Sequence, residues 1–147
     1  MMLRICLLVA ALIGVALPSV AHESRPAYLE LVEIQTGVFD VVWKRPIMGG
    51  LAMPLAVEWP QACQTATAGT AQNVVGAVVE RQMIDCGAGG LIGGRIMIDG
   101  LAGISGDVLV RVEFENGETQ TNLLKPAQPW LDVEGPRSSF AVAYDYF

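Results

Sequence analysis

The sequence has few of the side chains from which most catalytic sites are built. Its 147 residues include one histidine and three cysteines. The histidine lies near the N-terminus and no G-x-S-x-G motif occurs, so there is no serine–histidine–aspartate arrangement. The glycine-rich segment 87–94 leads into Arg95 and Ile96 rather than Lys and Ser or Thr, which excludes a P-loop. We therefore expect that the protein is not an enzyme.

Positive charge and long apolar runs are also scarce. Nine Lys and Arg stand against 15 Asp and Glu, giving a net charge of −6 at pH 7, and the basic residues do not cluster. Nucleic acids and anionic lipid surfaces are not expected partners, because both require a basic patch. The apolar run Ile5–Leu17 is shorter than the about 20 residues that span a bilayer. In the mature chain Ile47–Val57 is too short and contains Pro54, and Leu91–Ile104 is interrupted by Arg95 and Asp99, so we expect no membrane span there.

The N-terminal region has the pattern of a secretory signal peptide. Arg4 precedes the apolar run Ile5–Leu17, and Pro18 follows it. The small residues Ser19 and Ala21 occupy the third and first positions before the predicted cleavage site. The pattern predicts a signal peptide over residues 1–21, cleaved after Ala21, and a periplasmic or otherwise exported protein. An uncleaved anchor is the alternative.

Cleavage after Ala21 would make the single histidine, His22, the first residue of the mature chain. Its α-amino nitrogen and its Nδ1 could then chelate one metal ion, and Glu23 could add an oxygen ligand. Amine and imidazole nitrogens suit Cu(II) and Ni(II), with copper favoured by intrinsic affinity. The alternative is an exposed terminus that begins with histidine and binds nothing.

Two cysteines remain after cleavage, because Cys6 belongs to the signal peptide. In an oxidising compartment Cys63 and Cys86 are expected to form a disulfide, worth roughly 3 kcal/mol in the chain-entropy model. A thiol metal site or a redox pair is the alternative. Their wide separation and the absence of a C-x-x-C motif argue against both.

Alternating apolar and polar residues between Gly, Pro and Asn turns predict an all-β fold, an antiparallel β-sandwich of the immunoglobulin-like kind. Strands are expected at residues 25–35, 38–45, 55–59, 95–101, 107–115, 118–124 and 130–134. Pro46 is expected to end the second strand, and residues 61–73 to form a loop. Residues 74–85 fit a strand or a short helix. The domain is expected to cover residues 22–134, and 135–147 to be a C-terminal tail that docks as a last strand or the stub of a missing membrane region.

Two further groups of side chains have alternative interpretations. Three carboxylates near turns could supply oxygen ligands if they converge, and otherwise cap turns: Asp85, Asp99 and Asp107. Three tryptophans could form a carbohydrate platform, and otherwise pack in the core: Trp43, Trp59 and Trp130.

Three stretches carry a resemblance to a known family. They are Ala21–Leu31, Gly100–Leu101 followed by Asp107–Val112, and Lys125–Trp130. In this order and spacing they resemble the extracytoplasmic N-terminal region of the HupE/UreJ family, bacterial membrane proteins associated with hydrogenase and urease maturation. The resemblance implies a role with nickel or cobalt, and a membrane transporter component or another periplasmic protein as partner.

Members of that family continue into several transmembrane helices, whereas this sequence ends at Phe147. The expectation is a stand-alone or truncated version, or a membrane part encoded elsewhere, and transport itself does not carry over. The alternative function is a metal-free structural or protein-interaction module of the periplasm. Its contact surface would be the apolar loop Ile47–Leu55 and the aromatic C-terminal tail.

Overall fold

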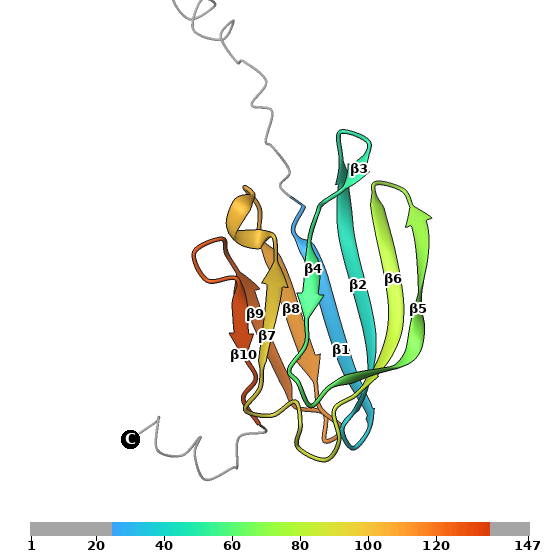
Figure 1. Ribbon diagram of the computed structural model, residues 1–147, viewed down its shortest axis with the longest axis vertical. Helices are drawn as coiled ribbons and strands as arrows, with labels where there is room; N and C mark the ends of the chain where they lie inside the picture. The colour runs from blue at the N-terminus through green and yellow to red at the C-terminus, as the bar shows by residue number, and fades with distance from the viewer. Residues whose placement is uncertain (1–24, 136–147) are drawn as a thin grey trace, which may run out of the picture.

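The computed structural model describes residues 25–135, and the predicted signal peptide and nearly all of the C-terminal tail lie outside this range. Within it the protein is all-β, as predicted: ten strands and one 3-10 turn, Leu101–Gly103 (η1), account for the regular structure. The strands form two sheets, and the smaller lies in front of the larger in Figure 1. No helix in this part of the chain is long and apolar enough to cross a membrane.

The larger sheet has seven strands. Six follow the order β5-β6-β2-β1-β8-β9, and β3 pairs with the end of β2. Their bounds are β1 Ala27–Gln35, β2 Val38–Met48, β3 Leu51–Ala52, β5 Gln64–Val74, β6 Ala77–Asp85, β8 Val108–Glu113 and β9 Thr119–Leu124. Two hairpins lie in this sheet, β1–β2 across Thr36–Gly37 and β8–β9 across Asn116–Gly117.

The smaller sheet has three strands in the order β10-β7-β4. They are β4 Ala56–Glu58, β7 Arg95–Asp99 and β10 Trp130–Asp132, all close to the predicted segments. Ile96 and Ile98 of β7 and Leu131 of β10 are buried, whereas the residues between them point away from the core. The period of two in the sequence therefore gives this sheet one apolar face.

One apolar core joins the two sheets. It contains alternate residues of β1, β2 and β8, together with Ile84 and the buried residues of the smaller sheet. No polar or charged residue in the described part of the chain is classed as buried. At about 25 cal/mol per Å² of apolar surface, such a core is the main source of stability. Its members on the three central strands are Ala27, Leu29, Leu31, Phe39, Val41, Trp43, Val108, Val110 and Val112.

The expectation of a purely antiparallel arrangement is wrong for one strand pair. β1 pairs with β8 in parallel, from Ala27↔Val108 to Val32↔Glu113, so the larger sheet is mixed. Both strands alternate in the same way, and both send every second residue into the core. Alternation determines which face of a strand is buried, but it carries no information on the direction of the neighbouring strand.

Three local predictions about β2, β5 and β6 are settled by the structure. The prediction of a loop at residues 61–73 is wrong, because Gln64–Val74 forms β5; all eleven residues of this strand are exposed, so it shows no apolar period. Pro46 does not end β2, which continues to Met48 with Pro46 opposite Ala77. For residues 74–85 the strand alternative is confirmed, with β6 beginning at Ala77 after the Val75–Gly76 turn.

The predicted pairing of Cys63 with Cys86 is confirmed. Their sulfur atoms lie 2.05 Å apart, at disulfide distance. Gln64 pairs with Asp85, so the two cysteines are the next residues outward at the open end of the β5–β6 hairpin. The covalent link therefore closes the hairpin at the end opposite to its two-residue turn.

Candidate functional site

A pocket is lined by residues at the start of β1, in the β2–β3 hairpin and in the β5–β6 turn. These segments lie at the same end of the molecule in Figure 1. The volume of the pocket is about 740 Å³. The residues that line it come from six separate segments: Arg25, Pro26, Pro46, Ile47, Met48, Met53, Gly76, Ser105, Gly106, Asp107 and Leu123. We refer to this hollow as the upper pocket.

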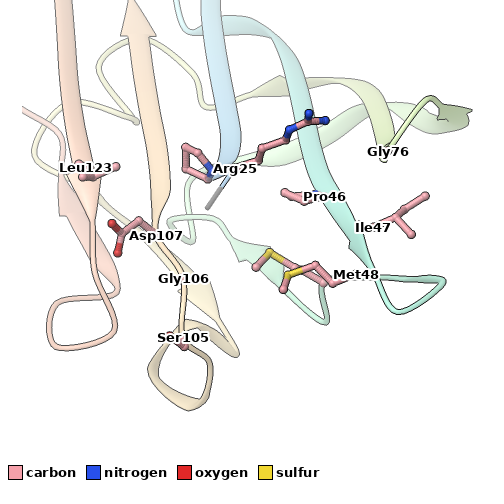
Figure 2. Close-up of a pocket in the computed structure, with 11 residues that line it drawn as sticks. Arg25, Pro46, Ile47, Met48, Gly76, Ser105, Gly106, Asp107 and Leu123 are labelled. Carbon is pink, nitrogen blue, oxygen red and sulfur yellow. The ribbon is translucent and has the colours of Figure 1, made fainter. Parts of the chain in front are cut away.

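Two charged residues stand in the wall of the upper pocket. Figure 2 shows Arg25 and Pro46 toward one side, and Ser105, Gly106 and Asp107 toward the other. The backbone fixes Asp107 relative to the start of β1, because Ala27 N–H donates to the Asp107 carbonyl oxygen at 3.0 Å. The start of β1 and the loop before β8 are therefore joined by a backbone hydrogen bond.

Methionine side chains supply the apolar part of the upper pocket. Met53 is buried, and Met48 is 63% exposed. Met53 is anchored by the backbone, since its N–H donates to the Pro46 carbonyl oxygen at 3.0 Å. Its methyl group lies beside Gly106, where an added Cβ would come within 3.1 Å of it. The lining of the pocket thus includes two thioether side chains as well as the Asp107 carboxylate.

The Arg45 guanidinium group holds the segment that carries Met53 by hydrogen bonds to its backbone. Arg45 pairs with Glu80 and donates from Nη1 to the carbonyl oxygens of Met53 and Leu55, both at 3.4 Å. The Arg45 Nε is buried and has no hydrogen-bond partner. Sequence reasoning missed this pair, although a signal existed: Arg45 continues the inward-facing series Phe39, Val41 and Trp43.

The principal predicted metal ligands, His22 and Glu23, lie outside the described residues. The three carboxylates singled out in the sequence do not come together. Asp85 caps a turn, accepting from Gly87 N–H at 2.9 Å, Asp99 lies in β7, and Asp107 lines the upper pocket. Among residues 25–135 no group of three or more His, Cys, Asp and Glu residues is placed to hold a metal ion.

The three tryptophans do not form a common platform. Trp43 is in the core at 4% exposure, and Trp59 packs against the core. Trp130 alone lines an open hollow of about 460 Å³ between β9 and β10. The guanidinium carbon of Arg95 lies 5.0 Å from the centre of the Trp130 ring, a cation–π distance. The core interpretation therefore holds for two of the three.

Arg95 also pairs with Asp132 on the outer face of the smaller sheet. Its Nε and Nη2 donate to the two carboxylate oxygens at 2.7 and 3.0 Å. This hydrogen-bonded pairing with Arg95 lowers the pKa of Asp132 below its usual value. The pair is solvent-exposed, so it contributes little to the stability of the fold.

A second charged network crosses the parallel pair β1–β8. Tyr28 donates to Glu30, and Arg111 donates to Glu30 at 3.5 Å and to Glu113 at 2.7 Å. Burial, followed by the neighbouring Glu30, raises the pKa of the Tyr28 hydroxyl. The carboxylates are occupied by Arg111, so this network joins two strands and presents no open ligand set.

Comparison with protein-family models, with curated proteins and with solved structures found no match to this chain. The function must therefore be argued from the residues themselves.

Proposed function

We propose that the protein is a non-catalytic exported domain that binds or presents a divalent metal ion, nickel, cobalt or copper, through its mature N-terminus. His22 would supply the chelating amine and imidazole nitrogens, and Glu23 an oxygen. The ion would serve transport or metalloenzyme maturation, with a membrane transporter component or another periplasmic protein as partner. This role is the one that the resemblance to the HupE/UreJ family implies.

One observation carries the proposal: the described chain begins in the wall of the upper pocket. Arg25 lines that pocket together with Asp107. Only three residue steps separate His22 from Arg25, and an extended chain of that length reaches at most about 11 Å. The terminus would therefore be within about 11 Å of Arg25, a reach that includes the upper pocket.

The donor types near the pocket favour copper among the three metals. Met48 and Met53 carry soft thioether sulfurs, which suit Cu(I), whereas the amine and imidazole nitrogens of the terminus suit Cu(II). The exposed Met48 can move, since methionine has a flexible and unbranched side chain. A site of this kind would accept nitrogen donors from the terminus and sulfur donors from the pocket.

The test is a titration of two forms of the protein with Cu(II) and Ni(II) by calorimetry. One form begins at His22, and the other carries one extra alanine before His22. The extra residue leaves the imidazole in place but separates it from the free amine, so we expect affinity to fall at least about tenfold. Equal affinities of the two forms would refute the N-terminal chelate.

The second candidate function is a metal-free interaction module, and a specific observation favours it. The tip of the β2–β3 hairpin exposes Met48 at 63% and Leu51 at 76%. Exposed apolar side chains at a rigid tip are typical of protein contact surfaces. For either function we propose that the two packed sheets form an immunoglobulin-like β-sandwich that serves as a scaffold.

A further inference from the structure

The open edge of the larger sheet has an unusual composition. β5 is the terminal strand, paired only with β6, and all eleven of its residues are exposed. From Gln64 to Val74 it contains no charged residue and no proline. Natural sheets normally protect a long edge with charges or proline, since the free N–H and C=O groups otherwise pair with another strand.

The other sheet edges differ from β5. β4 and β10 have three residues each, which is too short to template a stable pairing. β9, at the far edge of the larger sheet, lies against β10, and its Gln120 amide bonds the Asp132 carbonyl oxygen at 3.1 Å and the Glu134 N–H at 2.9 Å. β5 is therefore the long edge that stays open in the described part of the chain.

β5 is also held in an extended form. The disulfide closes one end of the β5–β6 hairpin, and the Val75–Gly76 turn closes the other. Two register shifts, between Thr65 and Thr67 and between Thr67 and Thr70, interrupt the first half of the strand. Such irregularities discourage pairing. The segment Thr70–Val74 pairs regularly with β6 and keeps a straight outer edge.

We propose that Thr70–Val74 is a self-association surface, on which a second copy of this chain adds its own β5 in antiparallel register. The two-fold axis passes beside Gln72, so that Thr70 faces Val74 of the second copy and Gln72 faces its own equivalent. The two larger sheets then become one continuous sheet. Main-chain hydrogen bonds supply the affinity, as in other strand-addition complexes.

The side chains of this segment fit an identical partner. The amides of Gln72 and Asn73 and the hydroxyl of Thr70 each carry both a donor and an acceptor, so each can bond its own kind. An isologous two-fold contact requires this self-complementarity. The net charge of −6 opposes contact between two copies over most of the surface, but not at a strand that carries no charge. Val74, which is 44% exposed, also gains cover in the pair.

The experiment measures the dimer dissociation constant of the exported chain by sedimentation equilibrium. We expect the wild type to dimerise in the micromolar range. The double variant Thr70→Lys/Gln72→Lys places like charges opposite each other at position 72 and adds a further positive charge beside them at position 70, so its dissociation constant should rise at least about tenfold. The double variant Thr70→Glu/Gln72→Glu should weaken the dimer similarly, and an equimolar mixture of the two should restore it.

The matched control is Thr119→Lys/Thr121→Lys, which adds the same charge to exposed positions of β9 at the opposite edge. It should leave the dissociation constant unchanged. Circular dichroism of all variants checks that each one folds. A wild type that stays monomeric at millimolar concentration overturns the proposal. So does an equal loss in the β9 control, or a mixture of Lys and Glu variants that remains monomeric.

Discussion

Removal of the Cys63–Cys86 disulfide should cost this protein about 3 kcal/mol of unfolding free energy. The two cysteines are separated by 23 positions, and the entropy of closing a loop of that length in the unfolded chain gives this magnitude. We expect the full loss of unfolding free energy, because the loop contains β5 and no residue of β5 is buried. Apolar contacts of this strand therefore cannot replace the covalent link.

The assay is urea unfolding of Cys63→Ala/Cys86→Ala, followed by tryptophan fluorescence. Wild type under reducing conditions is the matched control, because it loses the bond but keeps both sulfur atoms. Variant and reduced wild type should agree within about 1 kcal/mol. Cys86 is 3% exposed, so a larger loss in the variant would measure the contribution of its sulfur to packing.

Hydrogen exchange should place the effect in the structure. Amides of β5 and β6 should exchange faster in the variant than amides of β1, which lies between two strands in the centre of the sheet. The loop-closure reasoning would be refuted if the unfolding free energy of the variant were within about 0.5 kcal/mol of that of the oxidised wild type. A thiol titration that detects no free thiol must first show that the wild-type disulfide is formed.

Two further predictions concern a turn and a surface ion pair. Gly37→Ala should strongly destabilise the fold in urea unfolding, because Gly37 has φ +77° and an added Cβ would lie 2.1 Å from the Gly87 carbonyl oxygen; Gly117→Ala, at φ +84° with open space around it, is the control and should lose less. Asp132→Asn should lower the urea midpoint at neutral pH, where the Arg95 pair is intact. Because Arg95 lowers the pKa of Asp132 in the folded protein, this contribution is fully present above the ordinary aspartate pKa of about 3.9 and is lost as the pH falls through the lowered value. The difference between wild type and variant should shrink below about pH 4, and a constant difference down to pH 2 would contradict the assignment.

The sequence predicted those elements whose burial follows a clear period. In β8, Val108, Val110 and Val112 alternate with half-buried residues, and the Asn116–Gly117 dipeptide identifies the turn to β9. The disulfide was predictable as well, because the predicted cleavage after Ala21 would leave only two cysteines. In each case a local pattern carries the whole of the information.

β5 and the direction of β8 could not be predicted in this way. β5 buries no side chain, so its sequence of Thr, Ala, Gln and Gly carries no period and resembles a loop. The parallel pairing of β1 with β8 is decided by how the whole chain packs, since an inward-facing series such as Leu29 and Leu31 is compatible with a neighbour of either direction.

The upper pocket was not predicted from the sequence, for a related reason. Arg25, Met53 and Asp107 come from three distant segments, and no spacing in the sequence joins them. The apolar loop Ile47–Leu55 is predicted from the sequence to be a contact surface, but its place beside the start of β1 depends on the tertiary fold. The predicted N-terminal metal site is connected to the pocket only through the fold, which places Arg25 in the pocket wall.

The most direct test of the central claim is to export the full-length chain in a bacterial host loaded with copper, and to measure the intact mass of the periplasmic protein under native conditions. The account predicts a chain that begins at His22 and carries one metal ion. It also predicts that a His22→Ala variant is cleaved at the same position and carries no metal ion. A protein that begins elsewhere, or a variant that retains as much metal as the wild type, would contradict it.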